Sequence, residues 1–484
     1  MGDAGDTDAG TGADANGDGA PADAVAFGTS GWRAPVEEMT DERVRAFTQG
    51  VVAHLADEGR AGDPVGVCHD VRESSPRIAR EVARVLAAGG HDVVYSDRDR
   101  PTPLLSWAVR DRDLAGGVMV TASHNPPTYN GLKFFPADAA PPTPAVTDAV
   151  EARLGPPDPR PRSEHGTVRR VDLLEEYADH TLDFVGADLS DLTVVYDAMH
   201  GSGRGVTDAL LERTGAEVRR LRCDADPEFG GTDPEPGRAT LGDLAEQVRM
   251  TDADLGVAND GDADRVAVVT PERGVLDANL LFAAVYDALL AEDTLGVGTG
   301  PAVRTVSTTF LVDRVAAAHG ERVVEVPVGF KWVAEAMAEH DALVGGEESG
   351  GFSVRDHVRE KDGVLMALLA AAVEAARPID CRVEVLLAEH GEIHQDKRSV
   401  DCPDDRKAAA VDALGGRIPD GVAGEAVDDV VTADGFKLLL ADGSWLLVRP
   451  SGTEPVLRVY AEADSRERVA DLLDAGADLV RAVV

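Results

Sequence analysis

The chain has 484 residues, of which 43% are hydrophobic, and a formal net charge of −41 at pH 7. This length exceeds what one ordinary hydrophobic core serves, so we expect several domains. A charge this negative repels nucleic acids and anionic membrane surfaces, which carry the same sign, and we expect neither as a partner. No apolar run approaches the roughly 18 residues of a membrane span, and no basic, apolar leader opens the chain, which predicts a cytoplasmic protein.

The acidic residues are spread along the whole chain, and only six of the 47 basic residues are lysine. An acid excess with so few lysines suggests a halophilic protein, because high salt screens a dense anionic surface and makes it tolerable. Each remaining lysine is therefore a stronger functional candidate than usual.

Residues 1–24 are mainly Gly, Asp and Ala, with almost no large apolar residue. Such a segment cannot bury enough apolar surface to fold, so we predict a disordered acidic N-terminal tail.

From residue 25 onward, short β-rich runs alternate with helical stretches rich in Ala, Leu and Arg. VGVCHD at 65–70 predicts a strand, IAREVARVLAAGG a helix and HDVVYSD a second strand. LTVVYDA at 192–198 begins a second unit of this kind, and LGVGTGPA at 295–302 begins a third. Proline-rich stretches, at 141–162 and around 234–237, predict exposed loops or linkers. The repeated order of strand, helix and strand predicts successive α/β domains with largely parallel sheets.

The last hundred residues follow another pattern. KLLLADGSWLLVRP and PVLRVYAEA predict a hairpin and a further strand, and a helix is expected from Ser465. These elements predict a smaller α+β domain at the end of the chain.

The motif TASHNPPTYNGLKF follows a predicted strand at 117–121. The Asn125-Pro126 pair favours a turn, so we expect Ser123 at the carboxyl end of a strand, where α/β sheets place their ligands. A serine nucleophile needs activation and its phosphate product needs countercharge, which His124 and Lys133, expected in the same loop, are suited to supply. An ordinary turn capped by Ser and Asn is the alternative.

The motif DGDADR places Asp260, Asp262 and Asp264 after a predicted strand. In an extended segment alternate side chains project to the same side, roughly 6–7 Å apart, and a bend at Gly261 would let them converge. Oxygen-only ligands suit Mg²⁺, with a phosphate completing its coordination. The alternative is a solvated acidic loop, which is a serious rival in so acidic a chain.

Two further motifs are candidates for binding the ends of a substrate. In GGEESGG (345–351) the glycines allow close backbone approach, and Glu347 and Ser349 are suited to bond vicinal sugar hydroxyls, although such runs also form plain loops. Lys331 in PVGFKW and Lys361 in REKDG are candidate ligands, with a solvated chain end as the alternative reading for each.

The motif RPSGTEP (449–455) lies between two predicted strands. Its guanidinium, hydroxyl and backbone amide groups predict a phosphate-binding loop, with a polar hairpin loop as the alternative. The residues that would form this loop are Arg449, Ser451, Gly452 and Thr453.

Together these motifs resemble those of the α-D-phosphohexomutase family, which includes phosphoglucomutase and phosphomannomutase. TASHNP resembles its phosphoserine loop, DGDADR its magnesium loop, GEESGG its sugar loop and RPSGTEP its phosphate loop. FGTSGWR resembles the opening motif of the family and nominates Arg33. The resemblance extends over about residues 27–460.

The resemblance implies an α/β fold with three successive α/β/α domains, whose sheets are mixed and largely parallel, and a smaller C-terminal α+β domain. The active site is expected in the cleft between them. The predicted boundaries are 25–165, 166–273, 274–380 and 381–484, after the tail at 1–24.

The resemblance also implies roles at the reacting centre. Ser123 would carry a phosphoryl group that completes a magnesium site with Asp260, Asp262 and Asp264. Charge would be neutralised by Arg33, Lys133 and Arg265, and His124 or Lys133 would move the proton.

The substrate-binding roles follow in the same way. Glu347 and Ser349 would hold the sugar hydroxyls, and Arg449, Ser451 and Thr453 the phosphate that does not react. The implied ligands are Mg²⁺, hexose 1-phosphate, hexose 6-phosphate and a hexose 1,6-bisphosphate intermediate, bound by a monomer or a homodimer.

Several functions stay open at this point. GEESGG separates glucose from mannose mutases poorly, and phosphoglucosamine mutase is a less favoured alternative because its sugar loop more often reads GEQSGH. A magnesium-dependent sugar phosphatase would use the same carboxylates. A sugar-phosphate sensor is disfavoured, since it has no need of an intact Ser123.

Overall fold

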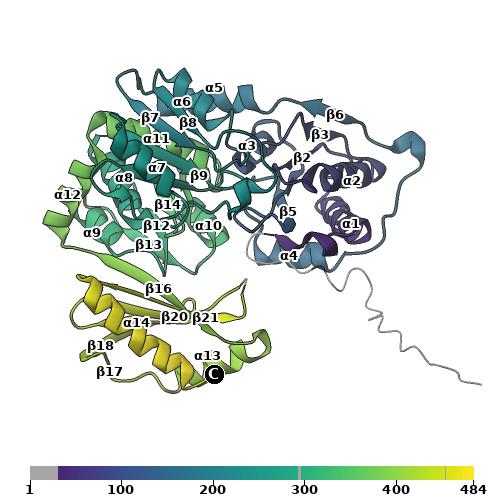
Figure 1. Ribbon diagram of the computed structural model, residues 1–484. Helices are drawn as coiled ribbons and strands as arrows, with labels where there is room; N and C mark the ends of the chain where they lie inside the picture. The colour runs from purple at the N-terminus through teal and green to yellow at the C-terminus, as the bar shows by residue number, and fades with distance from the viewer. Residues whose placement is uncertain (1–24, 26–30, 293–295, 453) are drawn as a thin grey trace, which may run out of the picture.

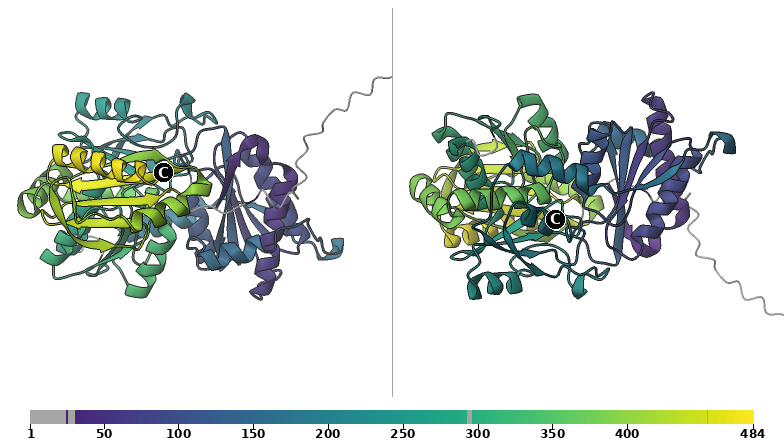
Figure 2. Two further views of the ribbon diagram at one scale, coloured as in Figure 1. Left: turned by 90° about the horizontal axis from the view of Figure 1, so that it is seen from below. Right: turned by 90° about the horizontal axis from the view of Figure 1, so that it is seen from above.

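The computed structural model describes residue 25 and residues 31–292, 296–452 and 454–484. The predicted tail at 1–24 and the predicted phosphate ligand Thr453 lie outside these residues. Three α/β units and one smaller unit follow one another along the chain (Figure 1). The first unit, in purple and blue, lies to one side of the teal and green second and third units (Figure 2).

The first unit is a sheet with helices on both faces. Its elements are β1 (Trp32–Pro35), α1 (Asp41–Asp57), β2 (Val65–His69), α2 (Ser75–Ala88), β3 (Val93–Ser96), α3 (Thr102–Asp111), β4 (Gly116–Val120), β5 (Tyr129–Pro136), α4 (Pro144–Glu151) and β6 (Val168–Val171). The strand order is β1-β5-β4-β2-β3-β6, with β4, β2, β3 and β6 parallel. Successive residues of a strand face opposite sides, so Val67 packs with α1 and α2 whereas Cys68 packs with α3.

The second unit repeats this design with five strands in the order β11-β10-β9-β7-β8. Its elements are α5 (Leu174–Val185), β7 (Thr193–Asp197), α6 (Thr207–Arg213), β8 (Glu217–Leu221), α7 (Gly242–Met250), β9 (Leu255–Asn259), β10 (Val266–Thr270) and β11 (Gly274–Val275). Strands β9, β7 and β8 are parallel, while β10 and β11 are antiparallel to their neighbours.

The third unit has four strands in the order β13-β12-β14-β15. Its elements are α8 (Ala278–Glu292), β12 (Ala302–Thr305), α9 (Leu311–Ala318), β13 (Val323–Val326), α10 (Phe330–His340), β14 (Val344–Gly346), β15 (Phe352–Val354), α11 (Gly363–Ala376) and α12 (Ile379–His390). Residues 363–374 of α11 are all buried, because this helix packs against β9 and β10 of the second unit as well as against α8. The second and third units therefore share one large core.

The fourth unit is an antiparallel sheet with two helices packed in its own hydrophobic cluster. Its elements are β16 (His394–Asp401), α13 (Asp404–Gly415), β17 (Gly421–Val422), β18 (Glu425–Val431), β19 (Phe436–Leu440), β20 (Trp445–Pro450), β21 (Val456–Ala463) and α14 (Arg466–Arg481). Trp445, Leu447 and Tyr460 form a separate cluster with Val306 of the third unit. The predicted fold class of three α/β/α units and a smaller α+β unit is confirmed.

Three local expectations differ from the structure. The strand predicted at 295–302 is wrong: residues 296–301 form no strand, and β12 lies at Ala302–Thr305. The proline-rich stretch 141–162 contains α4, which Pro144 begins, so it is not loop throughout. The predicted domain boundaries at residues 165 and 380 are the third expectation, because β6 pairs with β3 of the first unit and α12 continues past residue 380. We infer domain boundaries after β6, β11 and α12 instead.

None of the helices in the described part of the chain is both long enough and apolar enough to cross a lipid bilayer.

Candidate active site

Ser123 lies just after β4, in the loop that leads to β5. Its φ of +52° is a left-handed conformation that residues with side chains rarely adopt. The buried Arg72 stabilises this loop, since its Nη2 donates to the carbonyl oxygens of Ser123 at 2.8 Å and Asn125 at 2.6 Å. The guanidinium of Arg72 is in turn paired with the buried Asp70. The strained serine is thus fixed in place by its own unit.

The acidic loop joins β9 to β10, and Asp260, Asp262 and Asp264 in it are all buried. One oxygen of each carboxylate lies within 4.8 Å of the others. The expected bend at Gly261 is not the turning point, because the left-handed residue is Ala263, with φ of +53°. Gly261 instead allows the acidic loop to approach the serine loop closely, because a Cβ at this position would lie 2.7 Å from the carbonyl oxygen of Ser123.

The serine loop and the acidic loop therefore meet, although 137 residues separate their bonded partners. The Ser123 Oγ donates to the Asp260 Oδ2 at 3.0 Å. The Thr102 Oγ1, at the start of α3, donates to the Asp262 Oδ2 at 2.6 Å. The first unit thus contacts the acidic loop of the second unit directly, through Ser123 and Thr102.

The acidic loop has unsatisfied oxygens that suit a divalent cation. The Oδ1 atoms of Asp262 and Asp264 are buried and have no hydrogen-bond partner among the described residues. Buried carboxylate oxygens without a partner are costly, and three carboxylates this close repel one another. An oxygen-only set of this kind fits Mg²⁺, which these two atoms and an oxygen of Asp260 would hold.

Lysines balance the remaining charge of the loop. Lys133 lies in β5 and not in the loop where it was expected, and its Nζ donates to the Oδ2 atoms of Asp262 at 2.7 Å and Asp264 at 2.9 Å. The Lys361 Nζ lies 3.1 Å from the Asp264 Oδ2. Burial alone would raise the pKa of Asp264, but these two lysines hold it well below its ordinary value.

The other predicted catalytic residues surround the serine. The His124 Nδ1 lies 3.4 Å from the Ser123 Oγ. The positive charge of Arg265, followed by burial, lowers the pKa of His124 far below its ordinary value, so the ring is neutral. The Arg33 Nη1 donates to the Asn125 Oδ1 at 2.8 Å, and the Arg265 Nε lies 4.0 Å from the Asp264 Oδ1. All three side chains therefore border the acidic loop or the serine loop.

The predicted sugar loop joins β14 to β15 in the third unit. The Glu347 Oε1 accepts from the Gly329 backbone N–H at 3.1 Å, and burial raises the pKa of Glu347 to about 7. Ser349 is exposed. Lys331, on α10, has its Nζ 5.5 Å from the centroid of the Trp332 ring and makes no ion pair with another described residue. The structure thus brings Lys361 to the acidic loop but not Lys331.

The predicted phosphate loop joins β20 to β21 in the fourth unit. The Arg449 Nε donates to the Asp434 Oδ2 at 2.7 Å. The Lys407 Nζ donates to the Ser451 carbonyl oxygen at 2.7 Å, and Gly452 is exposed. A guanidinium and a lysine thus border the turn, as an anion-binding loop requires.

Sequence reasoning missed three residues that position the site. Arg72 and Thr102 have no motif of their own and act through contacts with segments distant in sequence. Asp434 reads as an ordinary Asp-Gly turn residue, yet its Oδ2 also accepts from the Val328 N–H at 3.1 Å. Because Gly329 next to Val328 bonds Glu347, Asp434 links the phosphate loop to the sugar loop.

Four family profiles of phosphoglucomutase/phosphomannomutase match the chain. The α/β/α domains I, II and III match residues 24–158, 175–274 and 277–389, and the C-terminal domain matches residues 399–479. The chain belongs to the phosphoglucomutase/phosphomannomutase family. It is therefore a phosphohexomutase, an isomerase that transfers a phosphoryl group within its substrate.

Named relatives of this phosphohexomutase differ in the sugar that their names specify. A probable phosphoglucosamine mutase of Methanopyrus kandleri is 36% identical over 465 residues, covering 95% of this chain and 98% of the relative. A phosphoglucomutase/phosphomannomutase of Thermococcus kodakarensis is 32% identical over 462 residues, covering 94% and 98%. The crystal structure of a putative phosphomannomutase from Thermus thermophilus matches with a TM-score of 0.79 and 32% identity, covering 95% and 99%.

Proposed function

We propose that this phosphohexomutase interconverts the 1-phosphate and 6-phosphate of glucose, of mannose or of both, through a phosphoserine at Ser123 and a hexose 1,6-bisphosphate. The observation that carries this proposal is the 3.0 Å hydrogen bond from the Ser123 Oγ to the Asp260 Oδ2. It joins the hydroxyl of Ser123 to a carboxylate set suited to Mg²⁺. A phosphoryl group on Ser123 would therefore lie beside the metal site.

The proposed reaction moves one phosphoryl group at a time. The group passes from the Ser123 Oγ to the free hydroxyl of the hexose phosphate, which becomes a bisphosphate, and the proton released by that hydroxyl passes to the Ser123 Oγ. The bisphosphate then turns round, and its other phosphoryl group returns to Ser123. Such transfers depend on positioning and charge neutralisation more than on covalent assistance.

Residues of the first and second units would serve the reacting end. Magnesium, when bound, supplies positive charge that stabilises the transferring phosphoryl group. Arg33 and Arg265 add positive charge beside the serine and acidic loops. His124 or Lys133 would move the proton: the His124 Nδ1 lies 3.4 Å from the serine oxygen, and Lys133 is bonded to Asp262 and Asp264.

Residues of the third and fourth units would hold the rest of the substrate. Glu347 and Ser349 would bond the sugar hydroxyls, and Lys361 would also bind the substrate. Arg449, Ser451 and the backbone near Gly452 would hold the phosphate that does not react, with Thr453 completing the loop. Lys331 stays a candidate substrate-binding residue. Since one phosphate site serves both orientations, either end of the bisphosphate can be held while the other reacts.

The choice of sugar is the open part of the proposal. The loop GEESGG favours glucose or mannose over glucosamine, whose mutases more often carry GEQSGH. The names of the relatives include phosphoglucosamine mutase, which makes glucosamine 1-phosphate the second candidate substrate. Glucose and mannose differ in the configuration of one hydroxyl, so one loop can serve both.

The test is an assay with glucose 1-phosphate, mannose 1-phosphate and glucosamine 1-phosphate, each seeded with the matching bisphosphate and Mg²⁺. Formation of the 6-phosphates is measured together with release of inorganic phosphate. We expect isomerisation of the glucose and mannose substrates without phosphate release. Preference for glucosamine 1-phosphate would overturn the sugar assignment, and stoichiometric phosphate release would make the protein a phosphatase. Gel filtration would test the expected monomer or homodimer.

A further inference from the structure

The loop between β7 and α6, residues 198–206, lies against the acidic loop although it carries no predicted site residue. The Ser202 N–H donates to the carbonyl oxygen of Gly261 at 3.0 Å. A Cβ at Gly201 would lie 2.9 Å from the same oxygen, so a side chain at this position would force the two loops apart. The 198–206 loop therefore contacts the backbone of the acidic loop directly.

The same loop carries Arg204, which is only 9% exposed. Its Nη1 and Nη2 donate to the Oδ2 and Oδ1 of Asp99 at 2.5 Å and 3.0 Å, and its Nη1 also donates to the Gly201 carbonyl oxygen at 2.9 Å. Asp99 belongs to the first unit, where it lies between β3 and α3. A bidentate pair of guanidinium and carboxylate fixes both distance and orientation, and partial burial strengthens it relative to an exposed ion pair. Arg204 therefore fastens the segment before α3 to the second unit.

The segment that Arg204 fastens ends on the acidic loop. Thr102, the first residue of α3, follows Asp99 by three residues. Its N–H donates to the Asp262 carbonyl oxygen at 2.9 Å, and its Oγ1 donates to the Asp262 Oδ2 at 2.6 Å. The ring of Pro101 restricts the backbone between Asp99 and Thr102, so this short link is stiff. The position of Asp99 thus sets the position of Thr102.

The bonds of Thr102 decide which oxygen of Asp262 is left for a cation. The Asp262 Oδ2 accepts from the Thr102 Oγ1 and the Lys133 Nζ, whereas its Oδ1 is buried without a hydrogen-bond partner in the described part of the chain. A displacement of Thr102 would remove one of these two donors and free the carboxylate to rotate. Residues that orient a metal ligand without touching the metal change its affinity by roughly 10- to 100-fold.

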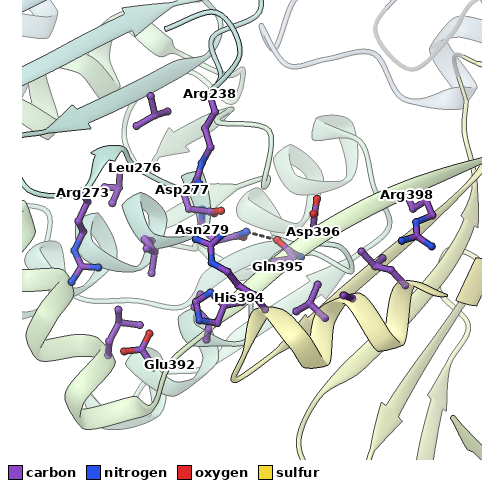
Figure 3. A pocket seen from close by; sticks show the side chains of 18 residues that line it. Arg238, Arg273, Leu276, Asp277, Asn279, Glu392, His394, Gln395, Asp396 and Arg398 are labelled. Carbon is purple, nitrogen blue, oxygen red and sulfur yellow. Dashed lines mark hydrogen bonds between the residues drawn. The ribbon is translucent and has the colours of Figure 1, made fainter. Parts of the chain in front are cut away.

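The junction with the fourth unit differs from this one. There the Asn279 side chain donates to that of Gln395, as the dashed line in Figure 3 shows. The Asn279 Oδ1 also accepts from the Thr309 N–H at 3.1 Å. These bonds join the fourth unit to the third through neutral groups and do not involve the acidic loop, so contact between units does not by itself reach the aspartates.

A second ion pair joins the first and second units at the far end of α3. The Arg112 Nη2, directly after this helix, lies 2.6 Å from the Glu176 Oε2 of α5. The ten residues of α3 span about 15 Å, so this pair is remote from Thr102. It therefore connects the same two units as Arg204 and Asp99 do, without reaching the acidic loop.

We propose that Arg204 is a positioning residue of the metal site: by holding Asp99 it keeps Thr102 against Asp262, which orients that carboxylate for a divalent cation. Arg204 acts through Asp99 and Thr102 and contacts none of the three aspartates itself within the described residues. This inference deepens the proposed function and rests on it, since it requires Mg²⁺ at the acidic loop.

The test is isothermal titration of the metal-free, full-length protein with Mg²⁺, well below the melting temperature of each variant. We expect Arg204→Gln and Asp99→Asn each to raise the Kd for Mg²⁺ about fivefold, and the double variant to raise it no further, because both remove the same bond. Arg204→Lys keeps the charge but loses the bidentate geometry, so its Kd should lie between those of the wild type and Arg204→Gln. Thr102→Val, which removes the Oγ1 bond, should raise the Kd at least as much as Arg204→Gln. Arg112→Gln is the matched control and should stay within about twofold of the wild type.

Each other outcome overturns the inference. Wild-type affinity in Arg204→Gln and Asp99→Asn would exclude the positioning role and leave the proposed function intact. A rise in Arg112→Gln equal to that in Arg204→Gln would show that any loosening between the two units has this effect. Additive effects in the double variant would show that the two residues act separately. If Arg204→Gln does not fold, Asp99→Asn tests the same bond from its other side. Absence of Mg²⁺ binding to the wild type would overturn the metal assignment of the proposed function as well.

Discussion

Ser123 and its acidic partners are buried and bonded across the first and second units, whereas the phosphate loop after β20 is partly exposed and contacts the third unit through few bonds. At the first centre, Ser123, Lys133 and Thr102 all reach the carboxylates of the acidic loop. At the second, Asp434 bonds Val328, and Lys437 pairs with Glu325. The groups proposed to react are thus preorganised, while the loop proposed to bind the remote phosphate is held more lightly. This contrast suits the proposed reaction, in which a bisphosphate intermediate would turn round in the site.

The largest effect should come from the preorganised centre. Ser123→Ala removes the proposed nucleophile, so we expect kcat to fall by about 10⁴-fold or more with an unchanged fold. Steady-state kinetics and circular dichroism measure the two quantities. Substantial mutase activity in this variant would falsify the phosphoserine role.

Removal of the metal should stop the reaction. The Oδ1 atoms of Asp262 and Asp264 are buried without a hydrogen-bond partner among the described residues, so we expect EDTA to abolish turnover and added Mg²⁺ to restore it. The coupled assay before and after chelation measures this. Activity that is indifferent to chelation would remove the metal assignment.

A substitution at Lys133 tests whether the acidic loop depends on the balance of its buried charges. Lys133→Met removes the ion pair of Asp262 with Lys133 and leaves Asp264 with Lys361 and Arg265, so we expect a loss of about 3 kcal/mol in the free energy of unfolding and about 10²-fold in kcat. Because Mg²⁺ can replace the missing charge, it should raise the melting temperature of the variant more than that of the wild type. Lys397→Met, on exposed β16, is the control. Equal Mg²⁺ shifts in all three proteins would contradict this account.

A substitution at Asp434 tests how the phosphate loop of the fourth unit is positioned. Asp434→Ala removes the acceptor that orients Arg449 and bonds Val328, so we expect KM to rise about tenfold with a smaller change in kcat. Asp442→Ala is the matched control, since Asp442 lies in the turn between β19 and β20 and bonds Ser444 and Arg468 instead. Similar KM values in the two variants would show that Asp434 does not position the phosphate loop.

The smallest effect is a pH dependence in the sugar loop. Burial raises the pKa of Glu347 to about 7, so this carboxyl is protonated below that pH and ionised above it. The ionised form accepts hydrogen bonds from sugar hydroxyls more strongly, so KM should fall several-fold between pH 6 and pH 8. Titration of the substrate phosphate also lies near pH 6, and Glu347→Gln separates the two, since it keeps only the phosphate contribution. If the pH profile of KM in this variant were identical to that of the wild type, Glu347 would be excluded as the cause of the pH dependence.

Much of the fold was predictable from local pattern. The buried strands β2, β4 and β7 and the apolar helix α11 follow from runs of hydrophobic residues with turn residues at their ends. The first strand of the third unit was misplaced because Val and Leu among glycines at 295–302 look like a strand, whereas the paired strand lies at 302–305. Lys133 was assigned to a loop because the Asn-Pro turn hides the start of β5.

The sequence alone determined which chemical groups are present: a serine beside an Asn-Pro turn, three alternating aspartates, a glycine-rich acidic loop and an arginine loop. Local spacing suffices for such motifs, because each lies in one turn of the chain. Only the tertiary structure decided that the serine and the aspartates face each other, that Lys133 bonds two of them, and that Asp434 links two loops. Those contacts join residues far apart in sequence, so they exist only once the sheets have packed together.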